Sequence, residues 1–380
     1  MSGPLAGIKV IELAGLGALP YGSLRLADMG AEIVRVERLN DVPEEPVPGA
    51  HNFWDRGRQS IGVNLKNPEG VETVLRLAEQ AEVFLESFRP GVAERLGLGP
   101  KDLLKRNPRI VYGRLTGWGQ DGPLAEAAGH SLNYEAITGV THTIGPRGGP
   151  PLPLLQILGD FAGGGLHLAF GVVCAVLEAR ESGQGQVVDG AMVDGVMSLM
   201  SVFYGMHSAG MHTDDRGTNL FDGGAPFYNI YETQDGQFVS VAPIEPHFYA
   251  LLIEKLGLDP SSLPEQNDRT GWPELRARFA EAFAMKTRAE WDALLLGTDA
   301  CYAPVLSLGE VAEFAHHLHR ETFVGSGPMP ELTPSPRLSR TPGKPRPSPA
   351  YPGADTELVL ESAGYSAEEI GNLRRVGAIR

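Results

Sequence analysis

Residues 8–36, with the sequence IKVIELAGLGALPYGSLRLADMGAEIVRV, decide the fold class of this chain. A short β-rich run over 8–13 is followed by a loop over 15–20, a stretch of helical composition over 21–29 and a second β-rich run over 32–36. A strand, a helix and a strand at this spacing predict a parallel βαβ unit, because parallel neighbours need a crossover connection.

The following residues keep the same alternation of strands and helices. The pattern predicts an amphipathic helix over 68–79, a strand over 81–86, a short helix over 100–107 and a strand over 110–115. Later it predicts a long buried helix over 161–180, a strand over 186–189 and a Met-rich helix over 193–207. We therefore expect an α/β fold whose large domain contains a Rossmann-like parallel sheet.

The character of the chain changes near residue 222. Two β-rich runs, 226–233 and 237–242, are joined by Gln-Asp-Gly and predict a hairpin, and amphipathic helices follow at 274–283 and 288–295. Nine prolines then fall within 328–352, which favours an extended crossing, and a capping box at Ser366 begins a last helix. The expected domains are a large domain over 1–222, a smaller α/β domain over 223–327, and a crossing with C-terminal helices over 328–380 that returns to the large domain.

Composition and charge exclude several classes of protein. The chain has 380 residues and a net charge of −15, which argues against broad nucleic-acid binding. Residues 1–120 carry equal numbers of acidic and basic residues, so an anionic ligand would find its better site there, unless the asymmetry is compositional noise. Two cysteines, Cys174 and Cys301, provide neither a disulfide framework nor a Cys-based zinc site.

Location is predicted from what the sequence lacks. The N-terminus has no basic patch followed by an apolar stretch, so no secretory signal is recognised. The longest apolar stretch, 166–177, is too short to span a bilayer. We therefore expect a cytoplasmic protein that does not enter a membrane.

Two motifs favour an ordinary interpretation over a functional one. Gly15 to Pro20 follows a strand as a dinucleotide fingerprint would, but Pro20 stands where Gly or Ala is needed, so a tight strand-to-helix turn is the better interpretation. The histidines of 316–319 lie among polar residues without a carboxylate at ligand spacing, which favours a solvated helix face over a metal site.

Three polar residues remain as candidates for chemistry, and each also has an ordinary interpretation. His130 follows a Gly-rich turn and could be structural. Asp160 precedes the long apolar helix and could be its N-cap, although free N–H groups and the glycines of 163–165 would also suit a bound ligand. Glu245 follows the predicted hairpin and could be an ordinary surface residue.

The chain resembles the α-methylacyl-CoA racemases of the family III CoA-transferase superfamily, over nearly its whole length. The motifs that carry this resemblance occur in order along the sequence: VIELAGL (10–16), LADMGA (26–31), SFRPGV (87–92), GHSLNY (129–134), GDFAGGG (159–165), GQGQVVD (183–189), DGGAPFY (222–228) and APIEPHF (242–248). The histidine of GHSLNY is the specific feature, because CoA-transferases of the superfamily typically lack it.

The resemblance implies inversion of 2-methylacyl-CoA thioesters through an enolate, without a cofactor. Such a 1,1-proton transfer needs an acid–base group on each face of the α-carbon, and a histidine and a carboxylate suit these roles. His130 is thereby assigned to one face and Asp160 to the other, with Glu245 paired to His130. The backbone N–H groups at the start of the Asp160 helix would donate hydrogen bonds to the enolate oxygen.

The resemblance also implies a CoA site and a dimer. The expected CoA contacts are Arg38, Arg58, Gly62, Val63, Asn64, Leu65, Lys66, Arg89, Gly129, Ser131, Leu132, Asn133 and Tyr134. Some of these arginines could instead pair with nearby glutamates. Five methionines between 192 and 211 would suit varied acyl chains or simply fill a helix core. Family members form interlocked homodimers, with the active site between the large domain of one subunit and the small domain of the other.

One departure and two alternatives remain. The family often has Asp directly after the catalytic histidine, whereas this chain has Ser131, whose hydroxyl can form hydrogen bonds but carries no charge. In a CoA-transferase, Asp160 would instead be a nucleophile that forms an aspartyl-CoA thioester, and His130 would have no required role. A protein that binds acyl-CoA without catalysis would show no proton exchange.

Overall fold

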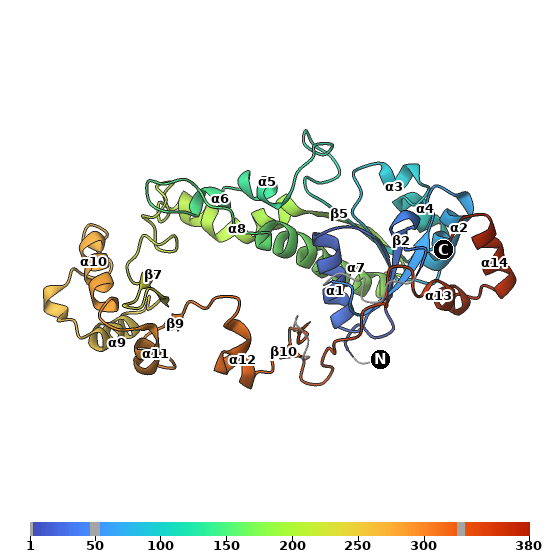
Figure 1. The fold of residues 1–380 in the computed structure, drawn as a ribbon. Coiled ribbons are helices and arrows are strands. Elements are labelled where there is room, and N and C mark those ends of the chain that lie inside the picture. Colours follow the sequence, from blue (N-terminus) through green and yellow to red (C-terminus); the bar gives the residue numbers. More distant parts are fainter. Residues whose placement is uncertain (1–2, 46–53, 325–330) are drawn as a thin grey trace. The chain divides into compact units, whose positions relative to one another are not determined.

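The computed structural model describes residues 3–45, 54–324 and 331–380. The chain divides into two compact units (Figure 1). Unit 1 combines the stretches Met1–Thr138, Leu154–Met200 and Thr333–Arg380, and unit 2 combines Gly139–Pro153 and Ser201–Leu332. Helix α8 (Met192–Ser208) crosses from one unit into the other.

A six-stranded parallel sheet lies at the centre of unit 1. In spatial order its strands are β3 (Arg58–Val63), β2 (Glu32–Arg38), β1 (Lys9–Leu13), β4 (Val83–Glu86), β5 (Val111–Thr116) and β6 (Val187–Ala191). Val10 pairs with Ile33 on one side and with Val83 on the other, so β-branched side chains lie beside one another. This strand order is that of a Rossmann fold, and the predicted α/β class with a parallel sheet is confirmed.

Strand β3 is an element that the sequence analysis does not predict. It begins with Arg58, Gln59 and Ser60, so its hydrophobic pattern is weak. The structure nevertheless buries Arg58 and Ser60, with Arg58 Nε paired to Glu12, Arg58 Nη2 donating to Ser23 Oγ, and the Ser60 N–H donating to Asp355. A strand held by buried polar contacts has no clear signature in hydrophobic periodicity.

Helices cover both faces of this sheet. One face packs against α2 (Pro68–Ala78), α4 (Pro100–Arg106), α13 (Thr356–Ser362) and α14 (Ala367–Arg375), and the other against α1 (Ala18–Asp28) and α7 (His167–Ser182). Ile11 belongs to the first hydrophobic cluster and Val10 to the second, because successive strand residues point to opposite faces. The smaller elements of unit 1 are η1 (Leu39–Asp41), α3 (Val92–Arg95) and α5 (Ser131–Ala136).

The long helix predicted over 161–180 begins earlier than expected, in a π-helical segment. This segment, η2 (Ile157–Leu166), is continuous with α7, and the Phe161 N–H donates to the carbonyl of Gln156, five residues back. Asp160 therefore lies inside the first turn and is not an N-cap. π-Helical turns within longer helices are frequent at functional sites.

The glycines after Asp160 serve helix packing. A Cβ at Gly165 would lie 2.3 Å from the carbonyl oxygen of Ala18 in α1, and a Cβ at Gly163 would lie 2.7 Å from the backbone nitrogen of Val196 in α8. These glycines allow η2 to approach two other helices closely. The expectation that they admit a ligand is therefore not supported.

The helix formed by η2 and α7 spans Ile157–Ser182, and its most apolar window has a mean hydropathy of 1.6 and is 44% buried. By length and composition alone it is long and apolar enough to cross a membrane, a criterion that core helices of water-soluble proteins also meet. Leu168, Val172 and Val176 pack in the second hydrophobic cluster, as in a core helix, whereas Phe170 is exposed. The apolar helix is thus longer than the stretch that the sequence analysis considered.

The C-terminal residues 333–380 belong to unit 1. The Ser60 N–H donates to Asp355 Oδ2 at 2.8 Å, and the N–H of Gly353 donates to Ser60 Oγ at 2.8 Å. The capping box at Ser366 is confirmed, since its N–H donates to Glu369 Oε2 at 2.7 Å and its hydroxyl accepts from the Glu369 N–H. Residues 328–330 of the predicted crossing lie outside the described residues.

Unit 2 is built on an antiparallel sheet of β7 (Asn229–Glu232), β8 (Phe238–Val241) and β9 (Tyr302–Pro304). The β7–β8 pair is the predicted hairpin. Helices α9 (Pro246–Leu256), α10 (Trp272–Phe283) and α11 (Arg288–Leu295) enclose a core rich in aromatic side chains. The other elements are α6 (Val140–Thr143), η3 (Pro260–Ser262), η4 (Val311–Glu313), α12 (Ala315–His319), β10 (Phe323–Val324) and β11 (Glu331–Leu332).

The division of the chain differs from the expected boundary at residue 222. Residues 139–153 and 201–222 belong to unit 2. Phe221 packs edge-on against Phe203 at 6.3 Å and against Tyr228 at 5.2 Å between ring centroids. These aromatic contacts join the end of α8 to the second core, a pairing that a change in composition does not reveal.

Candidate active site

The candidate site lies within unit 1, where strands β1 and β4 end. These strands are neighbours, yet the chain continues from them toward opposite edges of the sheet. A Cβ at Gly15 would lie 2.3 Å from Ser87 Oγ, so the loops that follow the two strands are in contact. Ligands of open α/β sheets commonly bind at such a switch point, outside the carboxyl ends of the strands.

Asp160 reaches this point from η2. A Cβ at Gly17 would lie only 3.1 Å from Asp160 Oδ2, and Gly17 has a φ of 64°. A side chain at position 17 would therefore crowd the carboxylate and strain the backbone. The loop after β1 and the start of α1 thus lie directly beside the half-buried Asp160.

The pKa of the Asp160 carboxyl is raised above its usual value. Burial is the largest cause, the charge of His130 acts to lower the pKa, and the charge of Glu135 raises it. A carboxyl with a raised pKa can both accept and donate a proton closer to neutral pH. His130 is thus close enough to Asp160 for the two charges to interact, as the predicted pair requires.

His130 is exposed and directly precedes α5. Its backbone N–H donates to Asn133 Oδ1 at 3.0 Å, and its carbonyl accepts from the Asn133 N–H at 2.7 Å. Asn133, predicted as a CoA contact, therefore fixes the backbone of His130. Leu132, another predicted CoA contact, is 45% exposed, and its side chain is apolar.

Tyr134 closes the loop that carries His130. Its hydroxyl donates to the carbonyl of Gly129, and its ring meets Trp118 edge-on at 4.7 Å. A Cβ at Gly129 would lie 2.7 Å from Tyr134 Cε1, so this position needs glycine. Burial and the charge of Asp160 raise the pKa of Tyr134, while the charge of Arg89 lowers it. Asp160 and Arg89 are therefore both close enough to Tyr134 for their charges to affect it.

Ser131 and Glu135 connect the segments that carry His130 and Asp160. Ser131 Oγ donates to Glu135 Oε1 at 2.8 Å and accepts from the Asp160 N–H at 3.2 Å. The Gly159 N–H also donates to Glu135 Oε1, at 2.8 Å. The sequence analysis missed Glu135, although its position four residues after Ser131 on one helix face was a usable signal.

These hydrogen bonds correct the expected oxyanion donors. The N–H groups of Gly159, Asp160 and Phe161 already donate to Glu135, Ser131 and Gln156. They are not available to an enolate oxygen. N–H groups without an intrahelical acceptor remain in the first turns of α1 and α5, which lie next to Asp160 and His130.

The predicted CoA contacts fall into two groups. Arg38 ends β2, Arg89 follows β4 and Lys66 follows β3, and all three are exposed near the carboxyl edge of the sheet. The other residues of 62–66 face the protein. Gly62 and Val63 are buried, Leu65 packs against the core, and Asn64 donates to the carbonyl of Gly377 at 3.2 Å.

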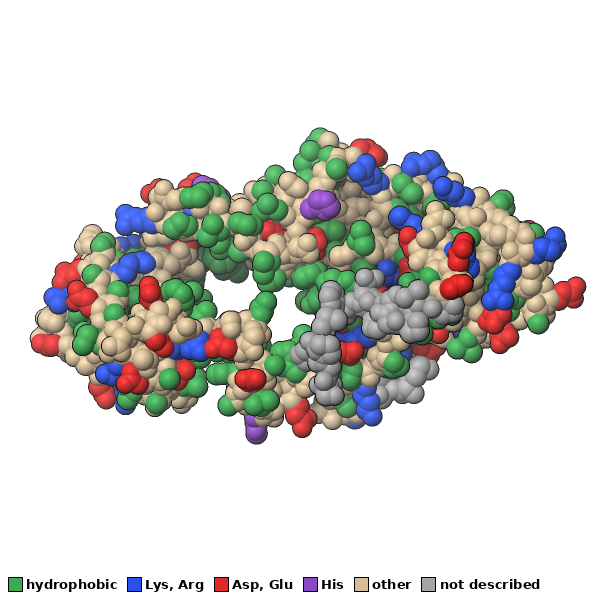
Figure 2. Space-filling view, viewed as in Figure 1, with side chains coloured by type: hydrophobic (Ala, Val, Ile, Leu, Met, Phe, Trp, Pro, Cys, Tyr) green, Lys and Arg blue, Asp and Glu red, His purple; other side chains and the backbone are tan. Residues whose placement is uncertain are grey.

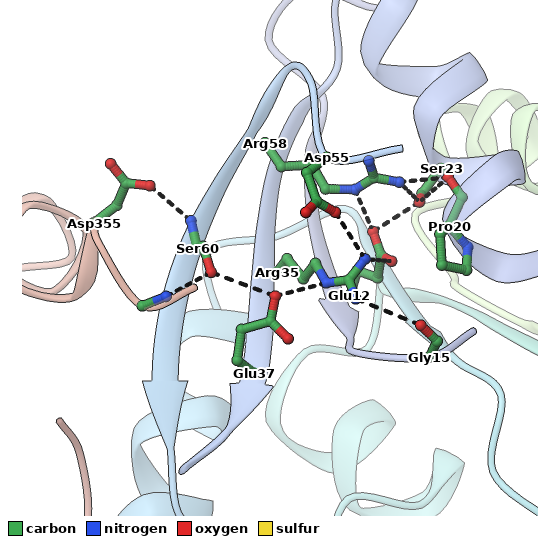
Figure 3. A network of polar contacts seen from close by, with 11 residues as sticks. Glu12, Gly15, Pro20, Ser23, Arg35, Glu37, Asp55, Arg58, Ser60 and Asp355 are labelled. Carbon is green, nitrogen blue, oxygen red and sulfur yellow. Dashed lines mark hydrogen bonds and ion pairs between the residues drawn. The ribbon is translucent and has the colours of Figure 1, made fainter. Parts of the chain in front are cut away.

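Arg58 does not fit its predicted role as a CoA contact. Its side chain is fully buried, with Nε 2.9 Å from Glu12 Oε2 and Nη2 2.6 Å from Ser23 Oγ (Figure 3). Nη2 also donates to the carbonyl of Pro20. The guanidinium therefore ties β3 to β1 and to α1, and we correct its assignment to a structural one.

Arg35 extends this buried network toward the loop after β1. Its Nε lies 2.8 Å from Glu37 Oε1, and one Nη lies 3.4 Å from Asp55 Oδ1 (Figure 3). Its other Nη donates to the carbonyl of Gly15 at 3.4 Å. The network thus helps to fix the loop that borders Asp160.

Glu245 belongs to unit 2. It is exposed and immediately precedes α9, where its carbonyl accepts from the Tyr249 N–H at 3.0 Å. Its pairing with His130, which belongs to unit 1, stays a prediction. Within the described part of unit 2, the Glu245 side chain forms no hydrogen bond or ion pair. Burial raises the pKa of Cys301, and the charge of Glu245 raises it further.

Within residues 3–45, 54–324 and 331–380, no group of three or more His, Cys, Asp or Glu side chains could hold a metal ion. The three histidines of α12 have no buried residue beside them in that helix. Both cysteines are unpaired thiols.

A family model described as CoA-transferase family III matches residues 5–356. The chain belongs to CoA-transferase family III. It is 45% identical over 369 residues to the α-methylacyl-CoA racemase of Mus musculus, covering 96% of this chain and 95% of that protein. It is 42% identical to the α-methylacyl-CoA racemase of Homo sapiens, covering 97% and 96% of the two chains.

A solved structure supports the fold of this family member. A CAIB/BAIF family protein from Brucella suis matches with a TM-score of 0.82 and 23% identity, covering 96% of this chain and 100% of that chain. At this identity the likeness concerns the fold alone. The resemblance read from the sequence motifs is thus confirmed at the level of the family and of its racemase members.

Proposed function

We propose that this protein is an isomerase that interconverts (R)- and (S)-2-methylacyl-CoA thioesters. One observation carries the proposal: His130 and the half-buried Asp160 interact electrostatically at the switch point of the sheet, although thirty residues separate them in the chain. The racemases that are 42–45% identical over nearly the whole chain support the same reaction. A CoA-transferase would need only the carboxylate.

The reaction is a proton transfer through an enolate. One group removes the α-proton, the electrons of the C–H bond form the enolate double bond, and the thioester oxygen takes the negative charge. The other group then donates a proton to the opposite face. His130 and Asp160 exchange these roles between the two directions, and the raised pKa of Asp160 suits a group that must also act as an acid.

The remaining assignments follow from this reaction. Arg38, Lys66 and Arg89 are exposed cations that would contact the phosphates of CoA, and Glu245 would orient His130. The reaction needs no cofactor, since CoA is part of the substrate. We expect no nucleic-acid or membrane partner and a cytoplasmic location.

We further propose a homodimer. Met197, Leu199 and Val202 on α8 are 46%, 51% and 66% exposed, and Figure 2 shows hydrophobic side chains along this helix. Apolar surface of this kind is typical of subunit interfaces. Light scattering coupled to gel filtration would give twice the chain mass of 40.7 kDa if the proposal holds, and the chain mass itself if it does not.

The test of the function uses one enantiomer of a 2-methylacyl-CoA in D₂O, without added acid. The α-proton is followed by NMR while chiral chromatography follows the configuration. The proposal expects deuterium at the α-carbon together with the other enantiomer. If neither appears, and a free carboxylic acid added next receives the CoA, then the protein is a CoA-transferase.

A further inference from the structure

Glu135 is a buried carboxyl group that has no cationic partner among the residues that the structure describes. Its side chain is completely buried, and Oε1 accepts the two hydrogen bonds from Ser131 Oγ and the Gly159 N–H. Among the described residues, Oε2 has no hydrogen-bond partner. Burying a carboxyl group in this way costs free energy, so its presence under the reacting groups calls for an explanation.

The hydrogen bonds form a continuous connection between the two catalytic segments. Glu135 lies on α5, which begins directly after His130, and it holds Gly159 of η2. Ser131, at the start of α5, holds the backbone of Asp160. Both elements that carry the acid–base groups are therefore fastened to each other by one carboxyl and one hydroxyl.

The close packing of these segments depends on glycine at position 159. A Cβ there would lie 2.3 Å from Ser131 Oγ and 3.0 Å from Ser131 Cα. No larger residue could bring η2 this close to α5 without moving one of them. The Gly-Asp pair is thus adapted to the hydroxyl of Ser131.

We propose that Glu135 is a positioning residue that acts through Ser131 to hold Asp160 at a fixed distance from His130. The inference rests on the proposed function, in which these two groups exchange the α-proton. The proposal also accounts for the serine at position 131. The family often has a carboxylate directly after the histidine, and in this chain Glu135 supplies a carboxylate one helical turn later.

Electrostatics supports the same role. The charge of Glu135 raises the pKa of Asp160, after the larger effect of burial. The other titratable or charged groups that act on this site are His130, directly before α5, Tyr134 on α5, and Arg89 in the loop after β4. None of them replaces Glu135, because His130 acts to lower the pKa of Asp160 and Arg89 acts to lower the pKa of Tyr134.

A second serine–glutamate pair in unit 1 provides a matched control. Ser23 Oγ donates to Glu12 Oε2 at 2.7 Å, and Glu12 is as completely buried as Glu135. Glu12, however, is paired with Arg58 and does not affect the pKa of Asp160. Ser23→Ala therefore removes the same kind of hydrogen bond without touching the reacting groups.

The experiment compares Glu135→Gln, Ser131→Ala and Ser23→Ala in the full chain. Glu135→Gln keeps an acceptor for both hydrogen bonds but removes the charge, so the acid limb of the kcat/KM profile should move to lower pH in both directions of the reaction. Ser131→Ala should lower kcat by about a hundredfold, as a displaced reacting group does, with little change in KM. Ser23→Ala should lower the melting temperature and leave the acid limb in place.

A second readout does not depend on turnover. The ¹³C carboxyl resonance of Asp160, assigned by its absence in Asp160→Asn, is titrated in the wild type and in Glu135→Gln. The inference expects a lower pKa in the variant. An unchanged titration and an unchanged kcat in Ser131→Ala would overturn it, whereas a wild type that titrates as expected but does not racemise would overturn the proposed function alone.

Discussion

Unit 1 contains two groups of buried polar side chains that treat charge in opposite ways. In the first, Arg35 and Arg58 are paired with Glu12, Glu37 and Asp55, so each buried cation has carboxylate partners (Figure 3). In the second, hydrogen bonds through Ser131 connect Glu135 to the backbone of the half-buried Asp160, and the charge of the exposed His130 acts on Asp160. The balanced group holds strands together, and the unbalanced group keeps proton affinities adjustable.

The largest expected effect concerns the unbalanced group. His130→Ala or Asp160→Asn should each lower the rate of racemisation by about 10³- to 10⁴-fold, because each removes one of the two acid–base groups. CoA affinity and the melting temperature should remain close to those of the wild type. His317→Ala, which removes a histidine from α12, serves as the control and should retain the wild-type rate.

Loss of either base with normal racemisation would show that the two residues are not the acid–base pair. Rates should be measured with each enantiomer by chiral chromatography of the released acid. A variant that also loses CoA affinity would instead indicate a disturbed fold, which circular dichroism would reveal.

The balanced group should respond in stability. Arg58→Leu removes the nearer of the two cations around the buried Glu12 and leaves only Arg35, at 3.7 Å, and breaking a buried pair in this way costs about 3–5 kcal/mol. Urea unfolding should show this loss, while the folded fraction should bind CoA with nearly wild-type affinity. A variant with full stability and weakened CoA binding would restore Arg58 to the CoA site.

A third group links stability to pH. Glu86 at the end of β4 is completely buried, and burial raises its pKa to about 7 despite hydrogen bonds from the Phe88 N–H and Arg114. The folded state therefore holds this proton more tightly than the unfolded state does. Stability should fall as the pH rises from about 4.5 to about 7, by about 3 kcal/mol.

Glu86→Gln should remove this dependence, since the amide does not titrate. Urea unfolding of both proteins at pH 5 and pH 7.5 gives the comparison. An equal pH dependence in the wild type and the variant would mean that Glu86 remains ionised throughout this range.

The smallest expected effect concerns the exposed cations. Arg38→Ala and Arg89→Ala should each weaken CoA binding about tenfold, as expected for loss of one charge-assisted contact of about 1–2 kcal/mol. Neither arginine is buried, so the free energy of unfolding should hardly change. Calorimetric titration with CoA measures the effect, and an unchanged affinity in both variants would place the phosphates elsewhere.

Much of the fold was predictable because hydrophobic periodicity reports it. Strands β1, β2, β4 and β5 have buried apolar side chains, and the pattern located them. Strand β3 was missed because its first half consists of polar residues held by ion pairs and hydrogen bonds and has no apolar pattern. The compact units divide the chain at other residues than 222, since aromatic contacts join the end of α8 to residues 221 and 228, which composition does not reveal.

The sequence motifs single out His130 and Asp160, and the charge of His130 acts on Asp160 in the structure, while their catalytic roles stay a prediction. The site was not predictable where burial decides the role. Arg58 looks like a phosphate ligand in the sequence, and only its contact with Glu12 shows otherwise. Glu135 looks like an ordinary helix residue, and only its hydrogen bond from the Gly159 N–H connects it to the segment that carries Asp160.

The most direct test of the central claim is α-proton exchange in D₂O by the two single variants, each supplied with each enantiomer separately. If His130 and Asp160 act on opposite faces, then each variant keeps one working base. His130→Gln should introduce deuterium into one enantiomer only, with retained configuration, and Asp160→Asn should do so into the other enantiomer only. Exchange of the same enantiomer by both variants, or racemisation by either, would contradict the account.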